Sequence, residues 1–457
     1  MNLEGGRRQK SRQQELPWES RGETPSVPRS DETPTAVQGT ERPGADDLLE
    51  AALARANMKA ALRRVKKNRG GPGVDGMTVD ELLPYLWEHW SEIKSSLLDG
   101  SYRPSPVERQ EIPKSGGGTR ELGIPTVLDR LIQQALLQVL QPQFDPTFSE
   151  HSYGFRPGRS AHGALRAGQR YVQEGRRTVV DVDLEKFFDR VNHDVLMGKV
   201  AKRIADKRVL GLIRHYLQSG VMVNGVRMER REGTPQGGPL SPLLANVLLD
   251  EVDKELERRG HAFVRYADDG RVFVYSRRAG ERVLAHLRKL YGKLHLQINE
   301  AKSAVARVWD RDFLGYSMWV APGRVVRLRV AKKALAQMKG RVRQITGRQS
   351  GRSMTAVVRE LRSYLTGWRN YFGLANTPGV FAQLDQWIRR RLRALQLKQW
   401  KRGRTIFREL RARGASVDVA AQVAGNAHRW WRNARRYVQL ILRNSHFAEL
   451  GLPSLSR

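Results

Sequence analysis

The sequence predicts an α+β fold in which mixed strands and helices are followed by a helical module. Up to about Val330, segments with strand-like alternation of apolar residues are interleaved with segments of helical periodicity. Beyond Val330 the pattern is helical and basic almost to the end. A chain of 457 residues is long enough for two to four domains with a sizeable core. This order of elements is typical of an α+β protein.

The first hundred residues contain a polar tail and two helical segments. Residues 1–45 are rich in Pro, Gly, Ser, Thr and Glu with a single aromatic, which predicts disorder because little apolar surface can be buried. Residues 46–68 have helical periodicity, with acids at the start and bases at the end, as the helix dipole favours. Residues 69–76 form a Gly/Pro loop, and a second helix is expected over about 78–98.

The strand-like segments come next. Residues 107–125 indicate a strand, a Gly-rich turn and a strand, and residues 126–144 indicate a helix with a broad apolar face. Residues 176–188 include a strand of alternating Val and Asp. Residues 263–276, "FVRYADDGRVFVYS", predict a hairpin whose Asp-Gly step favours a tight turn. Residues 312–330 predict another hairpin.

The charge of the chain indicates a polyanionic partner. Lys and Arg total 81 against 47 Asp and Glu, for a net charge of +34. From Ala321 onward there are 30 basic and 5 acidic residues, and half of the ten tryptophans. Arginine with interleaved aromatic rings suits RNA or single strands, because arginine meets phosphate and rings stack on bases. Packing of these tryptophans in a core remains the alternative.

Several classes of protein are disfavoured. The chain has no cysteine, which excludes disulfides and cysteine-ligated zinc modules. The N-terminus lacks an apolar signal segment, and there is no run of 18 apolar residues, so we expect neither secretion nor a membrane span. The expected location is the cytoplasm.

Two clusters of acids stand out against the basic background. Period-2 alternation puts Asp181 and Asp183 on one face of their strand, and Asp268 and Asp269 are adjacent in the predicted hairpin. Neighbouring carboxylates repel each other, and a divalent cation with oxygen ligands resolves that repulsion. Carboxylates from two strands could hold two metals about 3.5–4 Å apart, as in-line phosphoryl transfer requires. A solvated turn and a surface strand edge are the alternatives.

The acid clusters belong to an ordered series of motifs that resembles reverse transcriptases. "YADD" (266–269) resembles their metal-binding motif, and "DVDLEKFFDRVNHD" (181–194) resembles their first catalytic strand. The other blocks that match are "KSGGGTRELGIPTVLDRLIQQAL" (114–136), "EHSYGFRPGRSAHGAL" (150–165), "GTPQGGPLSPLLANVLLD" (233–250), "LQINEAKS" (296–303) and "DFLGYSM" (312–318). Seven blocks in order are far more specific than one tetrapeptide.

Three further segments narrow the resemblance to group II intron reverse transcriptase/maturases. They are "NRGGPGVDGMT" (68–78), "TPQGGPLSP" (234–242) and "LTGWRNYFGLA" (365–375). The absence of cysteine pairs makes the chain similar to the compact bacterial type without the endonuclease domain. The resemblance implies a right-hand polymerase fold with fingers and palm over 46–325, a helical thumb or maturase X domain over 326–400, and a basic DNA-binding tail over 401–457.

The resemblance also implies roles for individual residues. Asp183, Asp268 and Asp269 would be catalytic and would bind two Mg²⁺ ions, with a backbone carbonyl from Leu184, while Asp181 has no firm counterpart. Phe188 would be the aromatic gate that leaves no room for a 2′-hydroxyl. The remaining residues expected to bind the nucleotide are Lys114, Arg120, Gln236, Gly237 and Lys302.

Other residues are expected to bind nucleic acid. Arg156 would contact phosphate, and "RRRLRALQLKQWKRGR" (389–404) carries cations on several helix faces. The expected set is Arg156, Trp368, Arg369, Arg389, Arg390, Arg391, Lys401 and Arg402. A solvated helix is the alternative for residues 389–404, and solvated turn cations are the alternative for Lys114 and Arg120.

The implied function is RNA-directed DNA synthesis combined with binding of the parent intron RNA, which would promote splicing and target-primed mobility into DNA. Deoxynucleoside triphosphates, intron RNA and a DNA primer would be the partners. Two alternatives remain: a reverse transcriptase of another bacterial element, domesticated or CRISPR-linked, and a splicing cofactor that has lost polymerisation.

Overall fold

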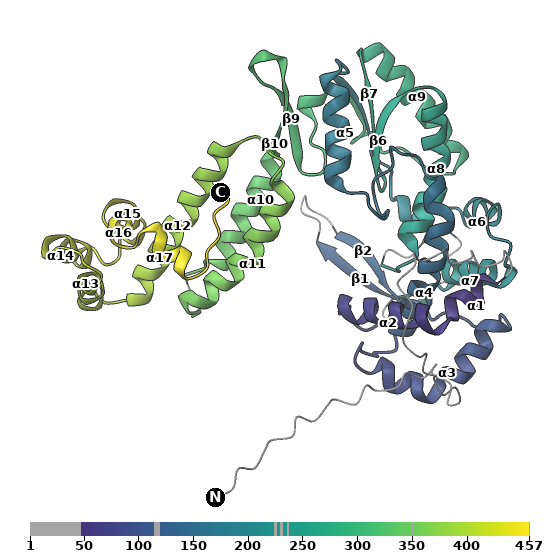
Figure 1. Cartoon of the computed structure of the whole chain (residues 1–457), viewed down its shortest axis with the longest axis horizontal. Coiled ribbons are helices and arrows are strands. Elements are labelled where there is room, and N and C mark those ends of the chain that lie inside the picture. The colour runs from purple at the N-terminus through teal and green to yellow at the C-terminus, as the bar shows by residue number, and fades with distance from the viewer. Residues whose placement is uncertain are drawn as a thin grey trace, which may run out of the picture. The chain divides into compact units, whose positions relative to one another are not determined.

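The structure is a computed structural model that describes residues 47–113, 119–223, 226–228, 232–234, 237–348 and 351–456. The expected disordered tail and the Gly-rich turn over 114–118 lie outside the described residues. Strands and helices mix up to Val330, and every described element beyond it is a helix, so the predicted α+β order is confirmed (Figure 1).

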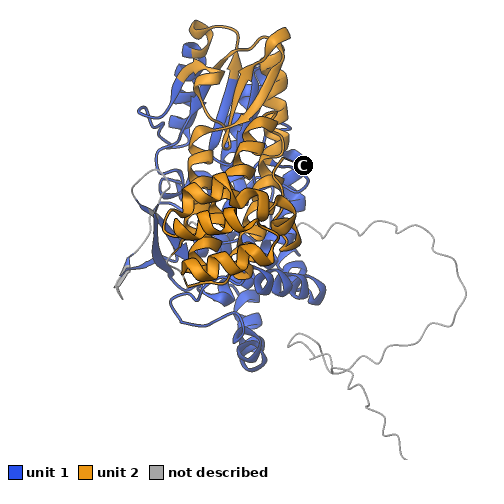
Figure 2. Ribbon diagram, turned by 90° about the vertical axis from the view of Figure 1, so that its left-hand side faces the viewer, with its two compact units in different colours: residues 1–160, 180–272, 281–304 blue, residues 161–179, 273–280, 305–457 orange. Residues whose placement is uncertain are grey.

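The chain divides into two compact units (Figure 2). The first unit takes residues 1–160, 180–272 and 281–304, and the second takes 161–179, 273–280 and 305–457. Within the described residues, no helix is long and apolar enough to cross a membrane.

The first unit begins with helices that differ in detail from the prediction. The periodic stretch over 46–68 forms two helices, α1 (Leu48–Leu53) and α2 (Arg55–Asn68), because Ala54 adopts an extended ψ of 140°. The expected second helix begins late, as α3 (Leu82–Leu98). Before it, the N–H and hydroxyl of Thr78 both donate to the Glu81 carboxylate at 2.8 Å, which forms a turn in place of helix.

A four-stranded sheet lies in the first unit with the strand order β2-β1-β4-β5. The predicted hairpin forms as β1 (Val107–Pro113) and β2 (Thr119–Ile124), which pair antiparallel. β4 (Val221–Val223) pairs parallel with β1 and antiparallel with β5 (Val226–Met228). α4 (Val127–Phe144) follows β2 and is capped by Thr126, whose hydroxyl accepts from the Asp129 N–H at 3.1 Å.

A second four-stranded sheet has the order β6-β7-β3-β8, and most of its residues belong to the first unit. Its strands are β3 (Thr178–Val182), β6 (Ala262–Tyr266), β7 (Asp269–Val274) and β8 (Ala304–Arg307). Val179 and Val180 are both 0 % exposed, so both faces of β3 are covered. The helices of this part of the chain are α6 (His193–Ala201), α7 (Lys207–Gln218), α8 (Ser241–Arg258) and α9 (Arg277–Lys293).

The second unit combines a hairpin, one earlier helix and a helical series. The predicted hairpin forms from β9 (Tyr316–Val320) and β10 (Val326–Val330), which pair antiparallel. α5 (Ala161–Gln173) is bonded to β10, since Gln169 Nε2 donates to the Val326 carbonyl at 2.7 Å. The helices that follow are α10 (Lys332–Ile345), α11 (Met354–Phe372), α12 (Pro378–Trp400), α13 (Gly403–Ala412), α14 (Val417–Gly425), α15 (Trp430–Arg436), α16 (Val438–Ile441) and α17 (Asn444–Glu449).

The core of the second unit contains a cluster of aromatic rings. The Trp368 ring centroid lies 4.7 Å from that of Phe372 and 5.8 Å from that of Phe381. Asp385 on α12 is buried and accepts hydrogen bonds from the N–H groups of Leu455 and Ser456, which fixes the last described residues against this helix. The expected domain boundary at 325–326 falls directly before β10 of the hairpin.

Candidate active site

Asp183 follows β3 directly, and hydrogen bonds of its backbone N–H and carbonyl with residues 303 and 299 hold it in place. Its N–H donates to the Ser303 hydroxyl at 3.0 Å, and its carbonyl accepts from the Asn299 N–H at 2.8 Å. Its side chain keeps 46 % of its surface exposed, and Lys302 Nζ lies 3.6 Å from its Oδ1. The carboxylate is therefore accessible, and the structure brings the predicted Lys302 beside it.

The turn that carries Asp268 is not the one the sequence predicted. Ala267 and Asp268 form the two-residue connection between β6 and β7, and Ala267 has a φ of +59°. Asp269 and Gly270 instead begin β7. We call β6, this turn and β7 the acidic hairpin (Figure 1). The expected turn at the Asp-Gly step was therefore wrong. The turn ends one residue before Asp269, and Ala267 takes the left-handed conformation there although alanine has no strong preference for a positive φ.

Asp181 has a partner that the sequence did not reveal. Arg271 on β7 is 5 % exposed, and its Nη2 lies 3.1 Å from Asp181 Oδ1. Arg271 Nε also lies 3.8 Å from Asp269 Oδ1. β3 and β7 are neighbours in the sheet, so this ion pair joins the two strands that carry the acids. The charge of Asp181 is thus balanced within the protein.

The remaining acids affect one another. Desolvation by the surrounding protein raises the pKa of Asp269 to about 6, Arg271 opposes the shift, and the carboxylates of Asp181, Asp268 and Asp183 add to it. The Asp269 side chain keeps 41 % of its surface exposed, and the neighbouring carboxylates add to the effect of desolvation. A cation placed among these acids would relieve the repulsion.

The donor set fits a divalent metal. Carboxylate oxygens are the ligands that Mg²⁺ prefers. Leu184 pairs with Ile298, and the bonds of this pairing are made by the residues on either side, Asp183 and Glu185, so the Leu184 carbonyl points away from its partner. Among the described residues, however, no three acidic, His or Cys side chains are already gathered as a metal site.

A buried ion pair supports the acidic hairpin. Arg265 on β6 is 2 % exposed and Asp253 on α8 is 1 % exposed, and Arg265 Nε donates to Asp253 Oδ1 at 2.9 Å. Arg265 Nη1 also donates to the Asn246 amide oxygen and to the Ala267 carbonyl, both at 2.8 Å. The guanidinium therefore ties the turn before Asp268 to a long helix.

Gly154 packs against the same turn. A Cβ on this residue would overlap the Ala267 nitrogen and lie 3.0 Å from the Tyr266 carbonyl carbon. The Gly154 carbonyl accepts from Asn246 Nδ2 at 2.9 Å. Sequence reasoning missed Arg265, Asp253, Asn246 and Gly154. The detectable signal was a charged residue within the apolar strand "AFVRY" (262–266).

The other residues expected around the nucleotide are placed as follows. Phe188 and Phe187 are both buried, with ring centroids 5.0 Å apart, and Phe188 is the more exposed at 9 %. Gly237 has a φ of +137°, and a Cβ there would come 2.6 Å from the Gly123 carbonyl oxygen, so its close backbone approach is to β2. Lys114, Gln236 and the Arg120 side chain lie outside the described residues.

Two residues expected to bind nucleic acid have structural positions instead. Arg156 is 8 % exposed, and its guanidinium bonds to the Asp145 carboxylate and to the Ser149 and Ser152 carbonyls. Trp368 is 8 % exposed within the aromatic cluster. The expectation that these two side chains contact nucleic acid is corrected, because Arg156 is bonded within the protein and Trp368 packs in the core.

The cations of α12 and of the residues near it, Arg369 on α11 and Lys401 and Arg402 after α12, are divided between the surface and the fold. Arg369, Lys401 and Arg402 are exposed, and Arg389 is half-buried. Arg391 Nε donates to the Thr346 hydroxyl at 2.7 Å, and the Arg390 guanidinium stacks 3.9 Å over the Trp431 ring. Arg393 is buried and donates to the Leu442 carbonyl at 2.8 Å.

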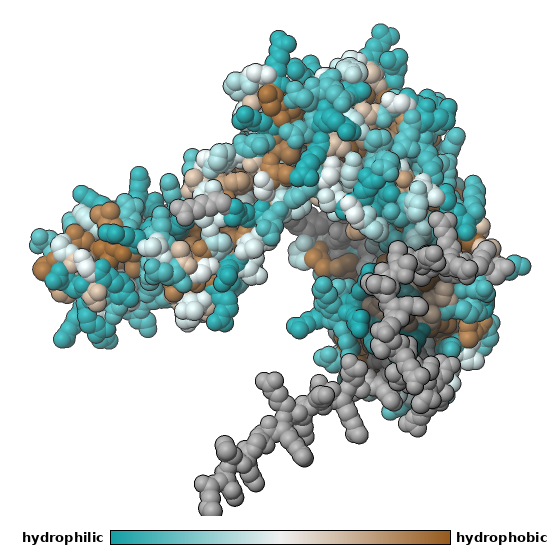
Figure 3. Space-filling view, viewed as in Figure 1, coloured by the Kyte–Doolittle hydropathy of each residue, from teal (hydrophilic) through white to brown (hydrophobic). Residues whose placement is uncertain are grey.

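A basic groove runs along part of the second unit. It has a volume of about 1130 Å³ and is lined by α12, α15 and the residues around α16. Among its described lining residues are Arg390, Arg393, Arg435 and Arg443, with Trp387 and no acid. Burial, with the nearby charge of Arg389, lowers the pKa of Arg393 to about 10. Hydrophilic residues project from the visible face of this unit, around smaller apolar patches (Figure 3).

The chain matches two protein families. Residues 112–318 match the family described as "Reverse transcriptase (RNA-dependent DNA polymerase)", and residues 335–414 match "Group II intron, maturase-specific domain". The first match contains the acidic site, and the second covers most of α10 to α13.

Two curated proteins illustrate this similarity. The chain is 33 % identical over 310 residues to Protein YkfC of Escherichia coli (strain K12), which covers 59 % of this chain and 81 % of YkfC. It is 39 % identical over 195 residues to the Group II intron-encoded protein LtrA of Lactococcus lactis subsp. cremoris, covering 42 % of this chain and 32 % of LtrA. The match to LtrA thus spans about a third of that protein's length.

Among solved structures, a chain of the partial Cas6-RT-Cas1–Cas2 complex is 23 % identical and covers 57 % of this chain and 46 % of its own length. The TM-score of 0.36 is too low to support an inference about function.

Proposed function

The chain belongs to the group II intron reverse transcriptase/maturase family of RNA-dependent DNA polymerases, and from this premise we propose that it extends a DNA primer along an RNA template. The observation that supports the proposal is the electrostatic effect of Asp183 and Asp268 on Asp269: Asp183 follows β3, Asp269 begins the neighbouring strand β7, and the charges of Asp183 and Asp268 help to raise the pKa of Asp269. These three carboxylates would hold two Mg²⁺ ions, with the Leu184 carbonyl as a further ligand.

When bound, the two ions would activate the primer 3′-hydroxyl and neutralise charge on the triphosphate. Asp183 and Asp268 would fix the positions of the reacting groups, and the Arg265 network would keep Asp268 in place. Lys302, which lies beside Asp183, would offer a positive charge to the triphosphate. Lys114 and Arg120 would clamp the same group, and Gln236 with Gly237 would meet the incoming base.

Sugar selection would depend on Phe188. Its ring is 9 % exposed and packs edge-on against Phe187, so its position is fixed by the core. A rigid ring beneath the sugar would clash with a 2′-hydroxyl and select deoxynucleotides.

We further propose that the second unit binds structured RNA, in particular the parent intron, and so promotes its splicing and mobility. The match over residues 335–414 supports this role, and the basic groove supplies cations without an acidic lining. Phosphate contacts of this kind dominate affinity for nucleic acid. The DNA-binding role expected of residues 401–457 rests on the same charge.

Purification of the protein from its native cell, followed by sequencing of the bound RNA, tests the intron role. Enrichment of one structured intron over bulk RNA, followed by protein-dependent splicing of that intron in vitro, is the expected result. Enrichment of a different noncoding RNA would support the alternative that the protein is a reverse transcriptase of another element, and would contradict the proposed role in intron splicing.

Primer extension on a defined RNA template tests the polymerase. We expect synthesis from deoxynucleotides that stops when EDTA removes the divalent ions and resumes with added Mg²⁺. RNA binding without any extension would support the splicing cofactor instead.

A further inference from the structure

Phe155 is an exposed aromatic residue beside the acidic hairpin. It keeps 49 % of its surface exposed. Its ring centroid lies 6.5 Å from that of Tyr266, the last residue of β6. Tyr266 precedes Asp268 by two residues, so the Phe155 ring stands close to the turn that carries a proposed metal ligand.

The backbone of Phe155 is held in an unfavourable conformation. Its φ is +58°, in the left-handed region that bulky residues rarely adopt. Such a conformation persists only where the surrounding structure imposes it, and it is often found at functional sites. A glycine would take the same φ without strain, so the ring itself needs an explanation.

The residues on both sides of Phe155 are firmly fixed. Ser152 is 0 % exposed and forms a bridge with Arg265, and the Tyr153 N–H donates to the Arg265 carbonyl at 2.8 Å. Gly154 packs against Ala267, and Arg156 is buried with its guanidinium bonded to Asp145. The segment is therefore a rigid support from which the Phe155 ring projects into solvent.

We propose that the Phe155 ring is a stacking platform for the 3′-terminal nucleotide of the primer strand. This inference rests on the proposed function, because the acids beside the ring would have to reach the 3′-hydroxyl of that nucleotide. A phenyl ring stacks on any base, as a polymerase that extends every sequence requires. The rigid support fixes the ring relative to Tyr266, and hence relative to the acidic hairpin.

A thermodynamic cycle tests the contact. Wild type and Phe155→Gly are each titrated with a primer–template duplex and with the same duplex whose 3′-terminal primer base is missing. Affinity is read by fluorescence anisotropy without deoxynucleotides. Glycine removes the ring and also relieves the backbone strain, so the variant is expected to fold at least as well as wild type.

Loss of the ring is expected to weaken binding of the intact duplex about tenfold, in line with the cost of losing one stacked base. Removal of the 3′-terminal base is expected to lower the affinity of wild type by about tenfold more than it lowers the affinity of the variant, because the ring then has no base to contact. Phe155→Tyr should retain wild-type affinity. Trp87→Ala, which removes another exposed aromatic at 51 % exposure, should bind as wild type does.

Equal losses from the abasic primer in both proteins would overturn the platform. So would coupling that persists when the missing base is moved five nucleotides from the 3′ end or into the template. Binding is measured without synthesis, so the two proposals can fail separately. If the cycle shows coupling but wild type extends no primer, the proposed polymerase activity is refuted and the stacking contact stands.

Discussion

The guanidinium of Arg265 donates to the carbonyl of Ala267 at 2.8 Å while it is paired with the buried Asp253. One cation thereby neutralises a buried acid on α8 and also holds the turn that presents Asp268. The position of a proposed metal ligand depends on an ion pair that no solvent reaches, and this dependence leads to the first prediction.

Asp253→Asn should destabilise the protein by roughly 3–5 kcal/mol, because it leaves Arg265 charged and buried without its counter-ion. The double variant Asp253→Leu/Arg265→Met should recover much of that stability, since the buried charges are gone. It should not recover primer extension, because the bond to Ala267 is lost as well. Urea unfolding and primer extension on the same samples separate the two effects. Full activity in the double variant would show that Ala267 needs no support from Arg265.

Asp268→Ala should reduce cDNA synthesis by at least about 10³-fold, because a group that stabilises transition-state charge is removed. Binding of the RNA template should change by less than about threefold, since phosphate contacts lie with the basic residues. Primer extension and filter binding give the two readouts. Synthesis at the wild-type rate would refute the metal assignment.

Gly154→Ala should lower primer extension by about 10²-fold, because the added methyl group displaces the acidic hairpin and small misplacements of reacting groups are costly. The matched control is Gly198→Ala on α6, where an added Cβ meets no atom within 4 Å. The control should keep full activity and gain up to about 1 kcal/mol of stability. Indistinguishable kinetics for the two variants would mean that the hairpin tolerates the shift.

Acid should unfold the protein partly through Asp206. This residue caps α7, and burial opposes its ionisation, but hydrogen bonds from Arg208 and from the Leu49 and Val209 N–H groups lower its pKa below the ordinary 3.8. A carboxyl with a lowered pKa in the folded state stabilises the protein above its unfolded pKa, and this contribution disappears as pH falls through the folded value.

Between pH 5 and pH 3, the melting temperature of Asp206→Asn should therefore fall by less than the melting temperature of wild type. Asparagine retains the cap but does not titrate. Thermal unfolding at each pH provides the measurement, and parallel pH profiles for the two proteins would contradict the role of this carboxyl.

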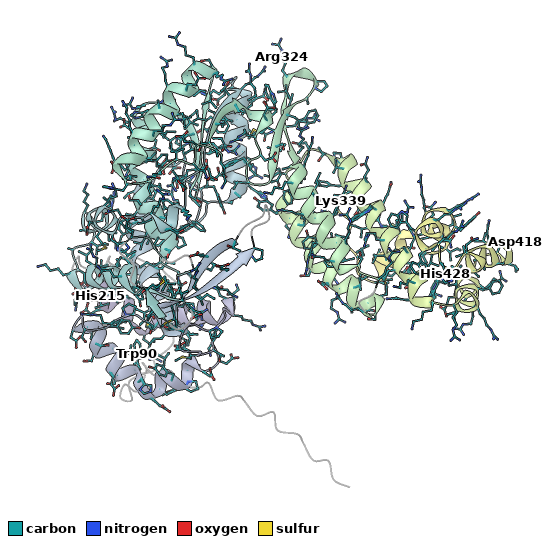
Figure 4. All side chains as sticks on the ribbon, turned by 180° about the vertical axis from the view of Figure 1, so that it is seen from behind. Trp90, His215, Arg324, Lys339, Asp418 and His428 are labelled. Atoms are coloured by element: carbon teal, nitrogen blue, oxygen red, sulfur yellow. The ribbon has the colours of Figure 1, made fainter. Side chains whose placement is uncertain are left out.

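The basic groove should contribute to the salt dependence of RNA binding. With a single-stranded RNA as the probe, the double variant Arg435→Gln/Arg443→Gln should make the slope of log K against log salt less negative by about 0.7 for each phosphate contact that is lost. Arg324→Gln, at an exposed cation that does not line the groove (Figure 4), is the control and should leave the slope unchanged. A slope that stays constant in the double variant would place the RNA elsewhere.

Much of the fold follows from local sequence patterns. The periodicity of residues 126–144 and the alternation in residues 312–330 predict α4 and the β9–β10 hairpin, because burial of one face dictates both. The candidate acids were also recognisable, since an ordered series of motifs surrounds Asp183 and "YADD".

The supporting contacts were not predictable in the same way. Arg271 pairs with Asp181 across 90 positions of sequence, and no local pattern specifies such a pair. Arg156 looked like an exposed cation and proved to be buried, because the carbonyls that receive it come from a compact loop. The turn at Ala267 depends on Arg265 and Gly154, which overcome the local preference of Asp-Gly.

The strand order β6-β7-β3-β8 has a consequence for the synthesis of the protein. β3 ends at Val182, but its partner β7 begins only at Asp269, so the ribosome must add 86 residues after Asp183 before the pairing can start. At typical elongation rates this takes roughly 4–17 s. During that time the nascent chain carries an unpaired, valine-rich strand, and chaperones that bind extended apolar segments have a defined interval in which to act.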